Sequence, residues 1–277
     1  MSAAQGDRER DPSPTSPRAG ERHTEAPSPP VPPSPARGRQ GGVFSLLRTP
    51  LAVAVGLVLV YLYVVHTPTR LGDEQILQRS FLQSRLIQHV ELVVFSFLIA
   101  AATALPLGIL LAQAGSRWRW PVFLVANLGQ AVPSIAALAL AFTILGLGLR
   151  SAVIALVIYA LLPILRNTLV GLQGVDAATV DAARGMGMTR LQTLFRVQLP
   201  LASPVIFAGL RTALVLVVGT ATLGNFIGAG GLGDVIAAGI GSGRNRIVVT
   251  GAGMVAALAL LFDWGFAFVQ RALTPRA

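Results

Sequence analysis

The stretch Asp181–Pro200, DAARGMGMTRLQTLFRVQLP, is a polar, arginine-bearing interruption between two strongly apolar segments. Its first part, with the residues just before it, reads VDAATVDAARG and is typical of a compact helix with small side chains. Gly187 then allows a turn that a β-carbon would obstruct. The following TRLQTLFRVQLP predicts a second short helix, which Pro200 should end because proline cannot continue the helical hydrogen bonds. Its apolar face at helical spacing would consist of Leu191, Leu194, Phe195 and Val197. The sequence thus predicts two short helices joined at a glycine, a rigid unit that can transmit force.

Apolar residues dominate the chain on both sides of this stretch. Of its 277 residues, 53% are hydrophobic and only 12% are charged, which is about half the roughly 25% charged share of soluble domains. Such a composition leaves too few charges to solvate the surface of a soluble protein. We therefore expect an all-α, polytopic membrane protein.

Six apolar runs approach the ~20 helical residues that a bilayer span requires. They lie between Arg48 and Arg70, after Glu91, from Pro121 to Leu149, after Arg150, and at 204–224 and 247–269. Prolines inside these runs should kink the helices, which membrane bundles tolerate; they are Pro106, Pro133 and Pro163. The sequence predicts about six transmembrane helices.

The arginines predict the orientation of these helices. With six spans, one side of the membrane receives Arg37, Arg39, Arg48, Arg117, Arg119, Arg166, Arg184, Arg190, Arg196, Arg271 and Arg276. The other side receives Arg70, Arg79, Arg85, Arg150, Arg244 and Arg246. The positive-inside rule makes the richer side the cytoplasm. Both termini and Asp181–Pro200 are therefore expected on the cytoplasmic side of the cell membrane.

Three regions follow from this pattern. Residues 1–42 are rich in Pro, Ser and Arg with almost no large apolar side chains, so burial cannot offset the entropy of ordering them. We expect a disordered cytoplasmic tail there rather than a signal peptide. Residues 43–84 would hold the first transmembrane helix and an extracytoplasmic loop, and residues 85–275 the remaining helices.

The residue types exclude several chemistries. All 22 basic residues are arginines, so the lysine of an ATP-binding P-loop is missing. No cysteine is present, which excludes disulfides and thiolate metal sites, and the three histidines are isolated. The arginines flank apolar runs instead of clustering with aromatic residues, a pattern that does not favour nucleic-acid binding. We expect a chain that is not an enzyme and binds no cofactor or metal itself.

The segment GAGGLG, Gly228–Gly233, fits the dinucleotide pattern G-x-G-x-x-G. That pattern requires a preceding strand and an acidic residue ~20 positions later, whereas this segment follows a predicted membrane helix and has no such acid. We interpret it as a close-packed extracytoplasmic turn.

Two ionisable residues fall inside predicted spans, where a charge is costly unless it is paired or hydrated. Counted from the cytoplasmic ends of their spans, Arg211 would lie ~12 Å deep and Asp263 ~15 Å deep. The similar depths suggest an ion pair that fixes helix register. The alternative is that each is hydrated independently in a cytoplasmic vestibule.

The interruption also carries a family motif. The pattern Glu-Ala-Ala, three residues, Gly, nine residues, Ile, one residue, Leu-Pro is the EAA loop of permease subunits in bacterial ABC importers. The chain matches it at Asp181, Ala182, Ala183, Gly187, Val197, Leu199 and Pro200, with Asp in place of Glu and Val in place of Ile. Residues 85–275 resemble permeases for glycine betaine, carnitine and choline through LPLGILLA, QAVPSIAALAL, YALLPILRNTLVGL and ATLGNFIGAGGLGDVIAAGI.

This resemblance implies the fold of a type I ABC importer permease, with its coupling loop at residues 176–200. It implies import of a compatible solute such as glycine betaine, choline, carnitine or proline. The expected partners are two ATP-binding cassette subunits that bind ATP, a second permease subunit and an extracytoplasmic solute-binding protein, all acting at a lipid bilayer. In the family the loop is the coupling helix that sits in a cleft of the ATPase.

Two other functional classes remain open at this stage. A self-contained secondary transporter or channel would need intramembrane acids or rings of charge, and only Asp263 clearly qualifies. A membrane scaffold without transport activity would leave the spacing of the EAA motif unexplained. The sequence does not indicate which solute is carried, or whether the second permease is another copy or a paralogue.

Overall fold

The computed structural model describes residues 44–68, 73–113 and 116–273. Within these ranges every regular element is helical, which confirms the expected all-α class. The tail predicted at residues 1–42 lies outside the described residues.

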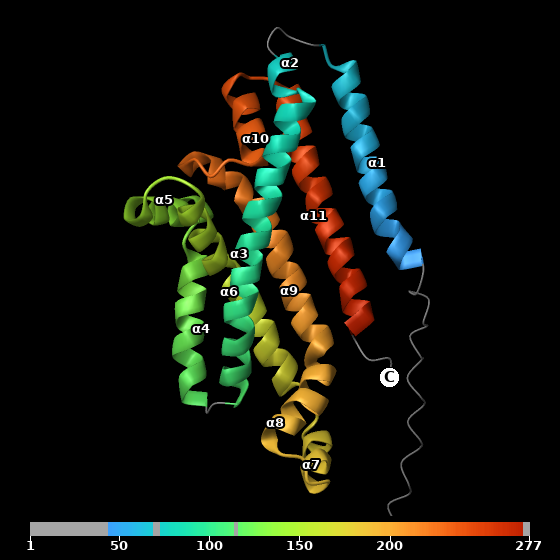
Figure 1. The fold of residues 1–277 in the computed structure, drawn as a ribbon, viewed down its shortest axis with the longest axis vertical. Helices are drawn as coiled ribbons and strands as arrows, with labels where there is room; N and C mark the ends of the chain where they lie inside the picture. Colours follow the sequence, from blue (N-terminus) through green and yellow to red (C-terminus); the bar gives the residue numbers. More distant parts are fainter. Residues whose placement is uncertain (1–43, 69–72, 114–115, 274–277) are drawn as a thin grey trace, which may run out of the picture. The chain divides into compact units, whose positions relative to one another are not determined.

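The helices follow one another along the chain with short connections (Figure 1). They are α1 (Phe44–His66), α2 (Asp73–Ile76), α3 (Arg79–Gln113), α4 (Ser116–Ala131), α5 (Ser134–Leu145), α6 (Leu149–Gln173), α7 (Ala177–Gly185), α8 (Arg190–Thr193), α9 (Leu199–Ala221), α10 (Leu232–Gly241) and α11 (Asn245–Leu273). A π-helical turn, Leu194–Gln198, joins α8 to α9, and a 3₁₀ turn, Thr222–Ile227, follows α9.

The long helices run along a common direction and alternate in polarity between two ends of the bundle (Figure 1). By length and composition, four described helices can cross a membrane alone: α3, α6, the helix from Arg190 to Ile227, and α11. The bent pair of α4 and α5 would make a fifth. The apolar part of α1, Pro50–His66, is shorter than these. The six crossings predicted from the sequence are therefore reached only if α1 and the α4–α5 pair each count as one crossing in addition to these four helices.

The third apolar run is broken rather than kinked. α4 and α5 meet at an angle of 99°, and Pro133 lies between them as the N-cap of α5. Proline supplies no N–H and disfavours a helical residue before it, so the helix ends there. The Tyr159 hydroxyl donates to the carbonyl of Val132 beside the break, and the Gln130 amide donates to the carbonyl of Tyr159 at 2.7 Å. These hydrogen bonds satisfy polar groups that an apolar surrounding would otherwise leave unpaired. Pro106 and Pro163, by contrast, lie within continuous helices.

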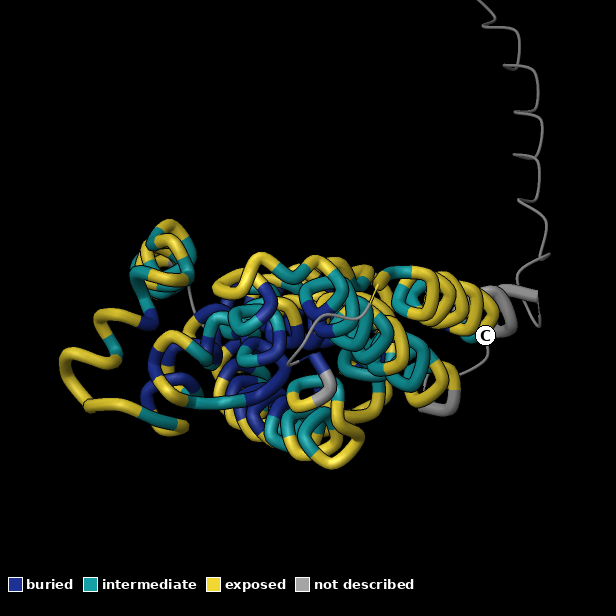
Figure 2. The backbone as a smooth tube through the Cα atoms, turned by 90° about the horizontal axis from the view of Figure 1, so that it is seen from above, coloured by how far each residue is buried: buried dark blue, intermediate teal, exposed yellow. Residues whose placement is uncertain are grey.

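The core is formed by α3, α6 and α9, and glycines let these helices approach closely. A β-carbon on Gly209 would lie 2.4 Å from the Asn167 β-carbon and 2.8 Å from the Pro163 carbonyl oxygen. One on Gly108 would lie 2.8 Å from the β-carbon of Thr168. Figure 2 shows the buried residues gathered in the middle of the helices, with exposed residues on the outer faces. Close approach of small residues is the usual packing of helices in membranes.

The helix α1 packs against α11, where a β-carbon on Gly253 would meet Val60 at 2.7 Å. From Pro50 to His66, most of the other side chains of α1 are exposed, as expected of a helix that faces lipid. The α1–α11 pair thereby extends the bundle beyond the core.

The GAGGLG segment connects α9 to α10 as a tight turn. Gly228, Gly230 and Gly231 have φ values of +71°, +76° and +87°, a region that favours glycine. A β-carbon on Gly233 would lie 2.0 Å from the carbonyl oxygen of Thr222. The glycines therefore serve close packing, and the element before them is a helix rather than the strand of a dinucleotide-binding unit.

Candidate functional site

The segment between α6 and α9 begins with the short helix α7. Its N-cap is Asp176, whose Oδ2 accepts hydrogen bonds from the Thr179 backbone N–H and hydroxyl, each at 3.1 Å. Such a cap satisfies donors that the first helical turn leaves unpaired. Val180 and Ala183 are buried on the side of α7 that faces α8 and the π-helical turn. Its other side is exposed and carries Asp181 and Ala182.

A glycine turn joins α7 to α8. Gly187 has a φ of +84°, and the Met188 N–H donates to the Ala183 carbonyl at 3.2 Å across the turn. α8 then opens with a capping box, in which the Thr189 hydroxyl and the Gln192 side chain each bond the backbone of the other residue. The turn and both caps fix the angle between the two helices with local hydrogen bonds. The turn at Gly187 between two helical segments matches the expectation from the sequence.

The expectation that Pro200 ends the second helix is wrong. The helix continues from α8 through the π-helical turn into α9, and Pro200 lies in the first turn of α9. In the π-helical turn the Leu199 N–H donates to the Leu194 carbonyl, five residues back. This shift of the hydrogen-bond register places proline where its missing N–H costs little. The second short helix is therefore the beginning of a long one.

Three exposed apolar side chains lie on the outer surface of the helical hairpin formed by α7, the Gly187 turn, α8 and the π-helical turn. Met186, Leu191 and Phe195 are 73%, 68% and 63% exposed, at the end of the bundle where α7 and α8 lie (Figure 1). Leu194, expected on the same apolar face, instead belongs to the core. We call Met186, Leu191 and Phe195, with the exposed Asp181 and Ala182, the coupling surface. Apolar side chains gathered at a helix-hairpin tip are typical of a protein interaction site.

The remaining motif residues connect the coupling surface to the bundle. Ala183 is buried, Gly187 is exposed, and Val197, Leu199 and Pro200 are half-buried along the continuous helix. Just beyond the hairpin, a β-carbon on Gly171 of α6 would lie 3.1 Å from the Ala202 carbonyl oxygen of α9. The hairpin is thus held at its base by close contact of the two helices that it joins.

Arg211 of α9 and Asp263 of α11 form an ion pair. The Arg211 Nε and Nη2 atoms donate to the two carboxylate oxygens of Asp263, a bidentate arrangement. The Arg211 side chain is 40% exposed and that of Asp263 19% exposed. Pairing lowers the cost of two charges placed among apolar residues.

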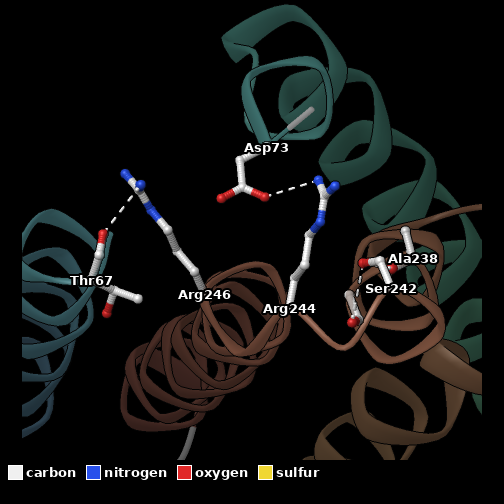
Figure 3. A network of polar contacts seen from close by, with 7 residues as sticks. Thr67, Asp73, Ala238, Ser242, Arg244 and Arg246 are labelled. Carbon is white, nitrogen blue, oxygen red and sulfur yellow. Dashed lines mark hydrogen bonds and ion pairs between the residues drawn. The ribbon is translucent and has the colours of Figure 1, made fainter. Parts of the chain in front are cut away.

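The opposite end of the bundle holds two ion pairs that the sequence did not indicate. Arg85 of α3 contacts Asp234 of α10 at 2.8 Å. Asp73 of α2 is buried and contacts Arg244 at 2.9 Å (Figure 3). The pair borders a cavity of about 230 Å³. Arg246 donates to the carbonyl of Thr67 at 3.4 Å. The members of these pairs lie far apart in the sequence, so no local spacing relates them.

No group of three or more metal-ligating side chains occurs among the described residues. The described part of the chain therefore offers the coupling surface, the bundle and its charged ends as functional features.

Comparison with known proteins gives a family assignment for these features. Residues 104–275 match the family model described as binding-protein-dependent transport system inner membrane component. This match includes the hairpin, α9 and α11.

Curated relatives carry names from solute transport. The chain is 41% identical over 189 residues to the glycine betaine/carnitine/choline transport system permease protein OpuCD of Bacillus subtilis (strain 168), covering 68% of this chain and 82% of the relative. It is 38% identical to the osmoprotectant import permease protein OsmW of Salmonella typhimurium, covering 71% and 93%.

A solved structure supports the arrangement of the helices. A chain of the MetNI methionine ABC transporter in an inward-facing conformation aligns with a TM-score of 0.64 and 25% identity. The alignment covers 73% of this chain and 100% of that one.

Proposed function

The chain belongs to the binding-protein-dependent transport system inner-membrane components, and from this membership we propose that it imports an osmoprotectant as the permease subunit of an ATP-driven transporter. The observation that carries the proposal is the coupling surface, which presents exposed apolar side chains at the tip of a capped hairpin. The chain contains no lysine, so it lacks the residue with which a P-loop contacts the phosphates of ATP. ATP hydrolysis is therefore assigned to a separate ATPase subunit that binds this surface.

The solute class proposed is that of small quaternary ammonium compounds. The names of the relatives include glycine betaine, carnitine and choline. Aromatic residues make up only 6% of the chain, although quaternary ammonium groups are usually held by aromatic cages. We assign recognition of the solute to an extracytoplasmic binding protein, with this chain as the passage.

The proposed complex contains two ATPase subunits, a second permease and the binding protein. The coupling surface would face the cytoplasm, as the arginine distribution indicates. Because α1 begins and α11 ends toward the end of the bundle where α7 and α8 lie (Figure 1), this orientation would also place residues 44 and 273 toward the cytoplasm.

The mechanism proposed is alternating access driven through the hairpin. Closure of the ATPase dimer around ATP would draw the two coupling surfaces of a permease pair together. Since α6 and α9 are in close contact at Gly171 and Gly209, displacement of the hairpin would tilt both helices as one body. A solute pathway between the two permease subunits would then open outward, and hydrolysis would reverse the tilt. ATP shifts this equilibrium only through its different affinity for the two states.

Transport in proteoliposomes tests the proposal. The chain is reconstituted with its purified ATPase and binding protein, and uptake of labelled glycine betaine, choline and carnitine is measured with and without ATP. Accumulation is expected only with ATP and the complete complex. Accumulation through the chain alone would contradict the proposal and favour a self-contained secondary transporter.

A coupling-surface variant tests the role of the hairpin. Leu191→Asp should reduce copurification of the ATPase by at least about tenfold, the loss expected for a central apolar contact. Leu191→Met keeps an apolar side chain of similar size and is the matched control. Equal ATPase recovery with both variants would remove Leu191 from the interface.

A further inference from the structure

A groove of about 620 Å³ lies between α3, α4 and α6. It is lined by Leu107 of α3, by residues of α4 from Trp118 to Gly129, and by residues of α6 from Ile158 to Leu165. None of the lining side chains carries a charge. The groove is therefore suited to an apolar ligand.

The spacing along α4 explains the length of the groove. The helix borders it with Trp118, Val122, Val125 and Gly129, among others. These positions are separated by four, three and four residues, so they lie along one face of the helix. From the first to the last, α4 rises ~16 Å at about 1.5 Å per residue. The hydrocarbon core of a bilayer is ~30 Å thick, so the groove is about as long as one leaflet is deep.

Contacts at both ends of α4 hold the groove open between them. At one end α4 meets α6, where a β-carbon on Gly129 would lie 3.0 Å from the Ile158 Cγ2 atom. At the other end Arg119 donates to the carbonyls of Leu111 and Ala112 at 3.1 and 3.2 Å. These carbonyls belong to the last turn of α3, which has no further helical donors for them. The groove is the space that remains between the two attachments.

A positive charge lies where α4 begins. The Arg117 guanidinium is 5.8 Å from the centre of the Trp118 ring, and Trp118 lines the groove. Arg117 is exposed and forms no ion pair with an acidic residue in the described part of the chain. The cation–π contact uses the face of the indole ring and leaves the guanidinium N–H groups available to a phosphate.

The surroundings of the groove indicate a lipid. Val125 and Trp118 are 69% and 58% exposed, and the neighbouring α3 and α6 are long enough to cross a membrane. α4 begins toward the end of the bundle where α7 and α8 lie (Figure 1), which the proposed orientation places at the cytoplasmic surface. Tryptophan and arginine are typical of that interface. The cytoplasmic leaflet carries anionic lipids, and basic pockets between helices near it bind their headgroups.

We infer that this groove binds one anionic phospholipid of the cytoplasmic leaflet. An acyl chain lies in the groove along α4, and the headgroup phosphate accepts hydrogen bonds from the Arg117 guanidinium. The lipid fills the space between α4 and α6 and so adds to the contact between these helices. The inference concerns the lipid alone and holds whichever solute the transporter carries.

Tryptophan quenching in the purified chain tests the inference. The chain contains three tryptophans, so Trp120→Phe with Trp264→Phe leaves Trp118 as the only one. This variant in detergent is titrated with phosphatidylglycerol whose acyl chains carry bromine, which quenches a tryptophan that it contacts. Brominated phosphatidylcholine of the same acyl chains is titrated separately. Phosphatidylglycerol should quench Trp118 at the lower lipid concentration.

Two further substitutions in this background separate the headgroup from the acyl chain. Arg117→Gln should raise the phosphatidylglycerol concentration needed for half-maximal quenching about fivefold, the effect of one basic residue near a membrane surface. Ala126→Leu narrows the groove without a change of charge and should raise that concentration at least as much.

Arg190→Gln is the matched control. Arg190 is an exposed arginine of α8, at the same end of the bundle (Figure 1), and lines no part of the groove. Its substitution should leave quenching by phosphatidylglycerol unchanged. Circular dichroism and gel filtration establish that each variant is folded; Arg117→Gln still tests the site if Ala126→Leu does not fold.

Four results would overturn the inference. The first is wild-type quenching by phosphatidylglycerol in folded Arg117→Gln. The second is equal quenching by phosphatidylcholine, which would show that headgroup charge is irrelevant. The third is recovery of Trp118 fluorescence with millimolar inorganic phosphate but not with sodium chloride of the same ionic strength, which would indicate a site for a free anion. The fourth is a disulfide between two copies of Val125→Cys in membranes, which would assign the groove to a permease pair. None of these readouts depends on transport, so they are distinct from a failure of the proposed function.

Discussion

Gly187 holds the hairpin turn at a φ of +84°, and no atom lies within 4 Å of the position where its β-carbon would be. The cost of Gly187→Ala is therefore conformational, about 1 kcal/mol for a left-handed backbone in a non-glycine residue. Arg184 and Arg190 flank the turn, so the rate at which trypsin cleaves after these arginines reports how often the turn opens. We expect about fivefold faster cleavage at these arginines in the purified variant.

Gly185→Ala is the control for this prediction. Gly185 ends α7, its φ lies outside the left-handed region, and its β-carbon position is also open. Alanine is favoured over glycine in helices, so cleavage should be unchanged or slower. If both variants are cleaved at the wild-type rate, the turn does not depend on the left-handed glycine.

The Arg211–Asp263 pair gives a second prediction at the scale of residues. Asp263→Asn leaves the arginine charge without its carboxylate. We expect a loss of about 2 kcal/mol in stability, between the values for exposed and buried pairs, because the two side chains are 40% and 19% exposed. The measurement is the thermal unfolding midpoint of the purified chain. The exchange of Arg211→Asp with Asp263→Arg should recover part of the loss.

An unchanged midpoint in Asp263→Asn would instead favour the alternative that each residue is hydrated on its own.

Among the ion pairs, the Arg211–Asp263 pair could be predicted from the sequence. Similar depths in two spans were enough to suggest the pairing. The pairs Arg85–Asp234 and Asp73–Arg244 were not foreseen, since they depend on how α2, α3, α10 and the start of α11 pack together.

Among the elements, α6 and α9 approach each other closely at Gly209, and the proposed mechanism depends on this contact to move both helices together. Gly209→Ala would place a β-carbon 2.4 Å from that of Asn167, so the helices must separate. Overpacking of this kind costs about 1–3 kcal/mol. We expect a lower unfolding midpoint and slower ATP-driven uptake. Gly219→Ala, on the same helix with nothing within 4 Å, should change neither quantity appreciably; an equal effect of both would argue against the close contact.

The lengths of the apolar runs predicted most of the long helices, and two of the differences from the structure involve proline. Pro133 breaks its run because α4 and α5 can satisfy the freed backbone through Tyr159 and neighbouring groups. Pro200 does not end its helix because a π-helical turn shifts the hydrogen bonds before it. Sequence indicates that a proline disturbs a helix, but the packing around it decides whether the helix bends, breaks or continues.

For the whole molecule, the alternating direction of the long helices places the hairpin and the α10–α11 connection at opposite ends of the bundle (Figure 1). The proposed membrane orientation then predicts that the hairpin faces the cytoplasm and that the α10–α11 connection faces the extracytoplasmic side. The chain contains no cysteine, so single cysteines can be introduced without a background of native thiols. Met186, on the coupling surface, and Ser242, just after α10, are both exposed and serve as reporters.

Labelling with a membrane-impermeant maleimide gives the last prediction. In intact cells Ser242→Cys should react and Met186→Cys should not; in inside-out vesicles the pattern should reverse. Met186→Cys should also become protected when the ATPase binds, because it lies on the coupling surface. Reaction of Met186→Cys in intact cells would place the hairpin outside the cytoplasm. No cytoplasmic ATPase could then contact it, and movement of α6 and α9 would require a different source of energy.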